Sequence, residues 1–187
     1  MKPAMTTTLP GFNSPAVGFE QPFEMLEACH DRVRRSLVLL GRLVGHIDTH
    51  GHDDKSRSAA SDVLRYFDIA APLHHEDEEL HVFALLDACG DVGLTAATSA
   101  LRGDHEHMSR LWSRLRLALG EWAAPGAAGQ VDAAVRQQAL EFDRLYSAHL
   151  RTEESVVFPA AKARMTAARV AEMSADMERR RHSAAPA

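Results

Sequence analysis

Apolar residues recur along most of this chain in alternating steps of three and four, the spacing that lines one face of a helix. Four such runs can be followed, beginning near Phe23, Val63, Leu94 and Val131. Short stretches with glycine, proline or clustered aspartate separate them. Because short connectors between long amphipathic helices favour antiparallel neighbours, the pattern predicts an all-α, up-down-up-down four-helix bundle.

Turn-forming residues mark where these helices are expected to end. The first helix should end in the stretch 48–58, and the second should run over 58–88 to a glycine suited to its C-terminal cap. The third should stop within 125–129. Pro72 lies inside the second helix and lacks a backbone donor, so we expect a kink or bulge just before His74.

The chain of 187 residues fits one domain with tails. Residues 1–20 lack helical periodicity and contain breakers, which predicts an irregular N-terminal arm. The bundle is expected over 21–163. Residues 164–187 are rich in alanine, methionine and arginine and are expected to extend the fourth helix before a C-terminal tail.

Each of the four apolar stripes contains one histidine at a position that the periodicity places in the core: His30, His74, His105 and His149. A single such histidine is usually an ordinary core residue with a neighbouring partner. Four of them, one on each helix, indicate a shared purpose. Counting residues to each turn at about 1.5 Å rise per residue places all four at one level of the bundle.

Two of these histidines are followed one helical turn later by a glutamate, as His74 with Glu78 and His149 with Glu153. Residues four apart share a helix face, so each pair directs a nitrogen and an oxygen into the same space. Both segments also place a phenylalanine five residues after the glutamate, which makes a weak twofold echo between helices two and four.

Carboxylates at core positions require a counter-charge, because burying an unpaired charge costs several kcal/mol. A divalent or trivalent cation supplies one, with glutamates bridging two ions and imidazoles completing each. A mixture of imidazole and carboxylate without thiolate suits iron better than a structural zinc. Cys29 adjoins His30 but lies about 100° round the helix, so we expect it in the core or beside the site.

These motifs in this order resemble the hemerythrin-like, or HHE cation-binding, proteins over about residues 23–160. The resemblance implies a four-helix bundle that holds two iron ions, oxo- or hydroxo-bridged. Glu78 and Glu153 would bridge the ions. It also implies binding of dioxygen or another small diatomic ligand, with oxygen or nitric oxide sensing or iron handling as the broad role. The terminal ligands would be His30, His74, His105 and His149.

One departure from the oxygen-carrying hemerythrins is informative. Those proteins have HxxxH on the third helix and an aspartate after the last histidine. Here the residue four after His105 is Ser109, and the partner of His149 is Glu153. With one imidazole fewer, water or another side chain would fill a position, or reactivity would replace reversible carriage. Oxygen transport is therefore the least supported of the family's roles.

Several further histidines and carboxylates lie near these motifs but off the strict stripe. His75 and Glu79 could reach the metal if Pro72 bends the helix, and His81 is a third neighbour whose place is open. His107 points nearly opposite to His105, which favours a solvated position.

Three other classes of protein are compatible with parts of this pattern. A ferritin-like oxidase is suggested by ExxH at 27–30 and 78–81, but it also needs inward glutamates from the other helices, which the third helix lacks. A metal-free bundle that binds partners through a basic C-terminal tail is a second alternative. An enzyme that reduces or oxidises a substrate at a di-iron centre is a third alternative. It stays open, because the sequence shows no general acid or substrate pocket that would decide between an enzyme and a carrier or sensor.

Charge and composition narrow the cellular setting. The net charge of −5 gives no overall field for gathering nucleic acid, and no run of 18 apolar residues suggests a membrane span. The two cysteines do not resemble a disulfide framework, so a cytoplasmic location is expected. Oligomeric state leaves no clear pattern.

Overall fold

The computed structural model describes residues 18–183, and all regular structure in this part of the chain is helical. Residues 1–17 and 184–187, which include most of the expected arm and the end of the tail, lie outside the described residues. The elements are α1 (Pro22–His50), α2 (Asp54–Arg65), η1 (Tyr66–Ala70), α3 (Ala71–Asp77), η2 (Glu78–Phe83), α4 (Ala84–Asp87), α5 (Val92–Ala123), α6 (Ala133–Thr152), η3 (Glu153–Val157), α7 (Phe158–Lys162) and α8 (Ala167–Ser183).

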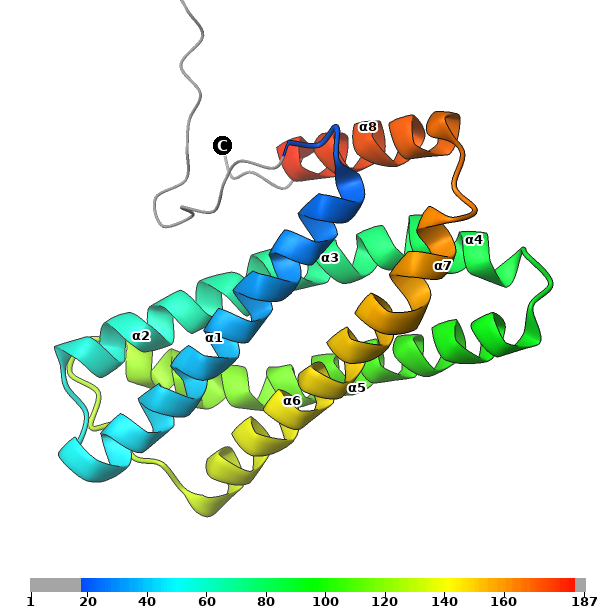
Figure 1. The fold of residues 1–187 in the computed structure, drawn as a ribbon. Coiled ribbons are helices and arrows are strands. Elements are labelled where there is room, and N and C mark those ends of the chain that lie inside the picture. The colour runs from blue at the N-terminus through cyan, green and yellow to red at the C-terminus, as the bar shows by residue number, and fades with distance from the viewer. Residues whose placement is uncertain (1–17, 184–187) are drawn as a thin grey trace, which may run out of the picture.

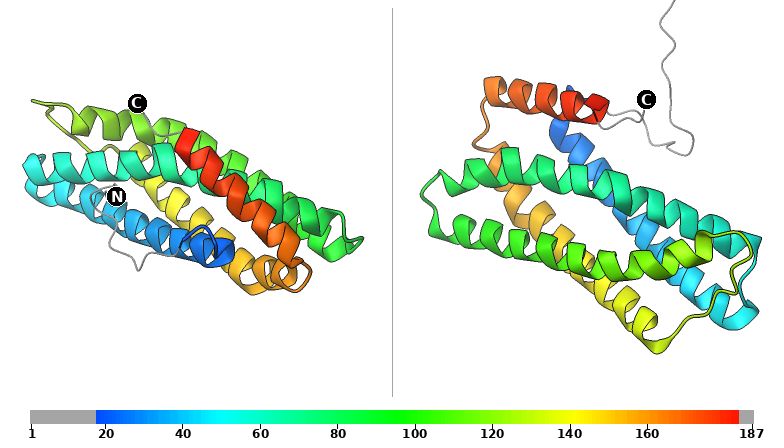
Figure 2. Two further views of the ribbon diagram at one scale, coloured as in Figure 1. Left: turned by 90° about the horizontal axis from the view of Figure 1, so that it is seen from above. Right: turned by 180° about the vertical axis from the view of Figure 1, so that it is seen from behind.

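Four long helical rods form the bundle (Figure 1). The first is α1, the second runs continuously from α2 to α4, the third is α5 and the fourth runs from α6 to α7. The first and third rods each pack against both the second and the fourth, as Figure 2 shows from two further sides. The predicted all-α, antiparallel bundle is confirmed.

The turn between the first two rods is much shorter than the stretch 48–58 expected from the sequence. Helix α1 continues to His50, where Gly51 adopts a φ of +81° that a side chain would disfavour. Asp53 then starts α2 through a capping box in which its carboxylate accepts from the N–H of Ser56 at 2.9 Å. The first helix ends within the expected stretch, but the second begins at Asp54 and not near residue 58, because polar residues that serve as caps resemble loop residues.

Three π-helical segments interrupt the second and fourth rods, and the first of them, η1, ends two residues before Pro72. The N–H of Ala71 reaches back five residues to the carbonyl of Tyr66, so the bulge expected near Pro72 is confirmed. A π turn accommodates one extra residue. Beyond η2 and η3 the apolar face therefore moves on by one position.

This shift corrects two core residues of the predicted stripes. Leu86 and Val157 are fully buried, whereas the stripe named Leu85 and Val156, and Val156 is 43% exposed. After η1 the predicted spacing still places His74 and Glu78 in the core, whereas after Val82 and Glu153 it names the residue one position before the buried one.

The sequence suggested that the last helix continues the fourth rod. In the structure it is a separate helix. The chain leaves α7 at Lys162, turns, and starts α8 at Ala167. The hydroxyl of the preceding residue, Thr166, accepts from the N–H of Arg169 at 3.3 Å. Helix α8 then runs back across α1 and beside α3 (Figures 1 and 2). Met173 and Met177 anchor it and are fully buried.

The core consists of two apolar clusters, and a polar layer lies between them. Along α1, Leu26 belongs to one cluster and Val33 to the other, with His30 between them. The same order holds on α5, where His105 lies between Leu101 and Met108. Helix α8 covers the cluster at the end where α1 begins.

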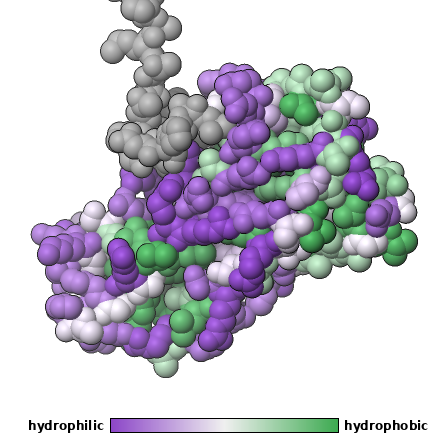
Figure 3. Space-filling view, in the orientation of Figure 1, coloured by the Kyte–Doolittle hydropathy of each residue, from purple (hydrophilic) through white to green (hydrophobic). Residues whose placement is uncertain are grey.

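The face of the molecule shown in Figure 3 is mostly hydrophilic, with apolar areas that are small and interrupted. Exposed large apolar side chains such as Val38 and Leu117 come from different helices. Among residues 18–183, none of the helices has the length and apolar character needed to cross a bilayer.

The larger cluster is centred on Phe142, which is fully buried and packs against the rings of Phe67, Trp112 and Tyr146. Replacing Phe142 with alanine leaves a cavity that these rigid neighbours cannot fill, so we expect a loss of about 3–5 kcal/mol in the free energy of unfolding. Urea denaturation measures it. Leu140→Ala on the exposed side of the same helix is the control and should change stability by less than about 0.5 kcal/mol. Equal effects would contradict the described packing.

Candidate metal centre

The polar layer contains the six residues singled out from the sequence, and each comes from a different element. His30 lies on α1, His74 on α3 and Glu78 at the start of η2. The others are His105 on α5, His149 on α6 and Glu153 at the start of η3. All six are buried, the most exposed being His105 at 6%. The expectation that they converge on one level is met by the structure.

The carboxylate of Glu78 lies between histidines of three helices. Its Oε1 is 3.0 Å from Nε2 of His74 and 3.6 Å from Nε2 of His30. Its Oε2 faces the other way, 3.6 Å from Nε2 of His105. The two oxygens of one glutamate are thus divided between two sides of the layer.

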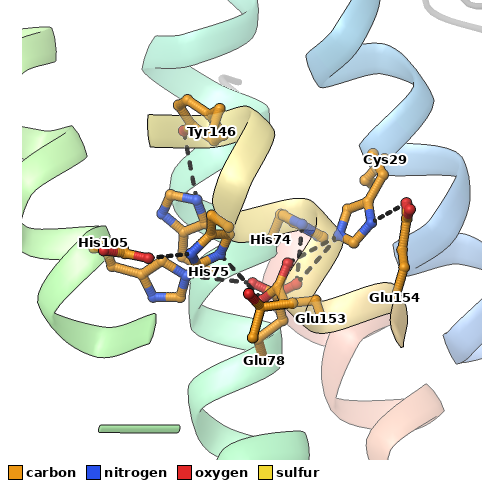
Figure 4. A network of polar contacts seen from close by, with 12 residues as sticks. Cys29, His74, His75, Glu78, His105, Tyr146, Glu153 and Glu154 are labelled. Carbon is orange, nitrogen blue, oxygen red and sulfur yellow. Dashed lines mark hydrogen bonds and ion pairs between the residues drawn. The ribbon is translucent and has the colours of Figure 1, made fainter. Parts of the chain in front are cut away.

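Glu153 is arranged in the same manner. Its Oε2 is 3.2 Å from Nε2 of His30, and its Oε1 is 3.1 Å from Nε2 of His149. On that second side the Nε2 atoms of His105 and His149 are 3.1 Å apart. Figure 4 shows Glu78 and Glu153 together at the centre of the network, with His105 to one side and Glu154 to the other.

These contacts divide the donors into two groups whose ligand atoms lie within 4.8 Å of one another. One group contains His30 and His74, the other His105 and His149, and both include Glu78 and Glu153. With metal–ligand bonds of about 2.1 Å, neighbouring donors on an octahedral ion are about 3 Å apart, close to the shortest separations here. The groups therefore have the size of two adjacent cation sites that share two carboxylates.

Several donor atoms in this layer make no hydrogen bond within residues 18–183. They are Nε2 of His30, both ring nitrogens of His74 and all four carboxylate oxygens of Glu78 and Glu153. Buried polar atoms are nearly always paired. A cluster of unpaired ones indicates a ligand that accepts their lone pairs. Cations fit this donor set of imidazole nitrogens and carboxylate oxygens.

The two carboxylates are held in opposite electrostatic states. Burial and the nearby charge of Glu153 raise the pKa of Glu78 well above its usual range. Burial also acts to raise the pKa of Glu153, but the close imidazoles of His149 and His30 outweigh it and hold that pKa well below normal. Two adjacent buried carboxylates cannot both ionise easily without a positive charge between them.

The histidines respond to the same environment. Burial lowers the pKa of His74 well below its usual value and that of His105 to about 3. For His149, burial acts to lower the pKa, but the adjacent carboxylates of Asp104 and Glu153 raise it to about 9. Neutral imidazole is the form that binds metals, and burial favours it for His74 and His105.

Three of the four histidines have a carboxylate at the nitrogen that faces away from the layer. Nδ1 of His30 donates to Glu154 at 2.9 Å, and Nδ1 of His105 donates to Glu79 at 2.7 Å. Nδ1 of His149 is 3.4 Å from Asp104. Such partners fix the ring orientation and the tautomer that leaves Nε2 free for a metal.

Glu154 is itself held by Arg34, whose Nη2 lies 2.7 Å from both carboxylate oxygens. Partial burial acts to raise the pKa of Glu154, but the hydrogen bonds from Arg34 and His30 hold it below its usual value. Glu154 therefore remains an ionised acceptor for His30.

These carboxylates were not singled out as ring partners from the sequence, although one signal was present. Glu79 and Glu154 each directly follow a paired glutamate in the two similar segments. The echo extends to Phe83 and Phe158, whose rings stack on His105 and His30 at centroid distances of 5.7 and 5.1 Å. The second rod thus supports the histidine of α5, and the fourth rod supports that of α1.

The remaining candidates lie outside the two groups. His75 is partly buried and stacks on His105 with centroids 3.9 Å apart, and its Nε2 is 3.4 Å from the hydroxyl of Tyr146. His81 pairs with Asp176 of α8. Neither residue contributes to the donor groups found in the described part of the chain.

Cys29 is buried beside His30, as expected, and burial raises the pKa of its thiol. It is not a member of either donor group found within 18–183. His107 is partly exposed and pairs with Glu141 on the surface, in agreement with a solvated role.

Fold and site together define a class: an antiparallel helical bundle with a candidate two-cation site in its core. Comparison with known families identifies it further. Residues 21–161 match the hemerythrin HHE cation-binding domain. The chain belongs to this family, and cation binding is the property that the family's description states.

A relative from Haemophilus influenzae is 35% identical over 103 residues, which cover 55% of this chain and 59% of that protein. It is described only as an uncharacterized protein. The match spans little more than half of each chain, so it supports kinship and gives no indication of activity.

The carboxylates behind the rings generate a testable expectation. Replacing Glu154 with alanine frees the ring of His30 and leaves Nδ1 without its acceptor, so metal affinity should fall about 10–100-fold. Competition with a chelator of known affinity measures the loss. Glu141→Ala is the matched control, because it removes a carboxylate–histidine contact of 3.1 Å on the surface. Equal affinities for both variants would show that Glu154 does not orient a ligand.

Proposed function

We propose that this protein is a non-haem di-iron protein that binds dioxygen or a related small ligand, with sensing or iron handling as its role. The ligands would be the six clustered residues, with Glu78 and Glu153 bridging. His30 and His74 would complete one ion, and His105 and His149 the other. We place the protein in the cytoplasm, with which the free thiols of Cys29 and Cys89 agree.

The observation that carries this proposal is the division of the carboxylate oxygens. Glu78 and Glu153 each direct one oxygen to either side of the layer, at distances of 3.0–3.6 Å from the histidine nitrogens. A single cation would draw both oxygens to one side. Two cations side by side explain the division, and a donor set free of thiolate favours iron.

The residues present leave room for a small ligand. Each group offers two imidazoles and one oxygen from each glutamate, four protein donors in all. Octahedral coordination has about six positions, so some would remain open to water or a diatomic molecule. Iron, when bound, would supply the reversible change of oxidation state that such binding needs.

The surrounding side chains determine what reaches these positions. Phe83 and Phe158 cover the rings of His105 and His30 and exclude bulk water from that side. His75 and Tyr146 form a partly buried polar contact beside His105. These surroundings therefore favour small, weakly polar molecules at the open coordination positions.

Metal analysis tests the proposal directly. Protein purified from iron-replete cells should contain about two iron ions per chain, and metal should raise the melting temperature, because a ligand at about 100 times its dissociation constant stabilises the native state by about 2.7 kcal/mol. The double substitution His74→Ala and His149→Ala removes one imidazole from each group. We expect it to lose both the iron and the stabilisation.

The matched control is the double substitution His107→Ala and His182→Ala. It removes two histidines with side chains that are 42% and 79% exposed. This variant should keep its iron. Retention of stoichiometric iron by the His74/His149 variant would refute the ligand assignment, and stoichiometric zinc in the wild type would refute iron.

Binding of a small ligand is tested separately on the iron-loaded chain. The oxidised protein should absorb from the ultraviolet into the visible, and the reduced protein should change its spectrum when dioxygen or nitric oxide is added. Absorption spectroscopy under anaerobic conditions follows this. Unchanged spectra with full iron content would leave the metal site standing and reject the small ligand, whereas repeated consumption of dioxygen would identify an enzyme.

A further inference from the structure

A third acidic residue besides Glu78 and Glu153, Asp77, is also fully buried, yet it belongs to neither donor group found within 18–183. It precedes Glu78 directly, and one residue along a helix corresponds to about 100° of rotation, so its side chain leaves the layer toward α8. Its partners are two consecutive arginines of that helix. Arg180 donates from Nη2 to Oδ1 at 2.5 Å, and Arg181 donates from Nη2 to Oδ2 at 2.5 Å.

Helix α8 contacts the second rod on both sides of Glu78. Before it, Arg180 also lies 3.3 Å from Glu76. After it, Nε2 of His81 is 2.8 Å from Asp176 of α8, which in turn accepts from Nε of Arg180 at 2.8 Å. The π segment η2, whose first residue is Glu78, is therefore held at its start and in its middle.

Apolar contacts from the buried face of α8 also hold the helix in place. Met173 and Met177 are fully buried in the apolar cluster that contains Leu26, and Val82 of η2 belongs to the same cluster. The guanidinium of Arg181 also lies over the ring of Phe19, 5.7 Å from its centroid. Since the family match ends at residue 161, α8 lies outside the shared domain.

The ion pairs are unequal in burial, and this decides what their loss would do. Asp77 is fully buried, whereas the side chains of Arg180 and Arg181 are 16% and 22% exposed. The arginines can reach water without Asp77, but Asp77 cannot reach water without moving the backbone. Breaking a buried pair by removing one partner is strongly unfavourable for this reason.

We propose that Asp77, Arg180 and Arg181 are positioning residues for Glu78, through which α8 sets how firmly the core site retains its metal. The inference rests on the proposed function and deepens it. Removal of the arginines deprives the carboxylate of Asp77 of the two guanidinium groups that pair with it, and the segment that carries Glu78 shifts to hydrate it. Glu78 then no longer presents one oxygen to each side of the layer.

The test uses the full-length, iron-loaded protein and the double substitution Arg180→Gln and Arg181→Gln. At a temperature well below unfolding, iron release to an excess of a ferrous chelator should accelerate at least about tenfold, as for other supports of metal ligands. The absorption spectrum of the bound iron should change as well. Hydrogen exchange of residues 77–83 should rise.

Arg179→Gln is the matched control, because Arg179 is the next residue on the same helix and is 68% exposed. It should release iron at the wild-type rate. A rescue variant adds Asp77→Asn to the two glutamine substitutions, which removes the buried charge together with its partners. This triple variant should regain most of the wild-type retention and spectrum.

The possible results separate the two proposals. If the wild type binds no iron, the proposed function fails and the positioning role fails with it. If the wild type binds iron and the Arg180/Arg181 variant matches Arg179→Gln in release rate and spectrum, this inference alone is overturned. A lower melting temperature with unchanged spectrum and release would likewise overturn it, since α8 would then be a structural support only.

Discussion

The whole arrangement depends on one electrostatic constraint: two carboxylates share a dry layer in the middle of a helical bundle. Glu78 and Glu153 are fully buried, and each raises the free energy of ionising the other. Four imidazoles surround them, and burial favours the neutral form of His74 and His105. Without a cation the layer interrupts an otherwise apolar core, which is a poor way to stabilise a bundle. The layer is understandable if it lowers the stability of the bundle without metal and in return provides a cation-binding site.

Around this layer the chain repeats one design twice. Each HxxxE segment supplies a histidine, a central glutamate, a second glutamate that orients a histidine on a neighbouring rod, and a phenylalanine that stacks on the same ring. The repetition is incomplete at one point. Asp104 lies behind His149, while Nδ1 of His74 has no hydrogen-bond partner among residues 18–183. The two halves of the layer are therefore similar in outline and unequal in detail.

Much of this could be predicted from the sequence, because helical periodicity and short turns place residues from distant segments at one level. The bundle and the convergence of the six side chains follow from that counting. Support for the rings could not be predicted in the same way. The contact between His30 and Glu154 joins residues 124 positions apart, and only the assembled bundle shows which carboxylate meets which ring. The separate course of α8 was missed because its two buried methionines are too few to reveal a partner.

The π segments have a consequence for how this chain can change over time. Each one puts the helix out of phase by a single residue, so the lower and upper parts of the same rod face the core only because that offset is present. Deleting one residue within η1 would straighten the rod yet rotate one side of the break by about 100° relative to the other. Either His74 or Val63 would then face solvent. Length in these segments is thus as strictly constrained as residue identity, and we expect natural variation to accumulate by substitution there, with insertions and deletions confined to the loops.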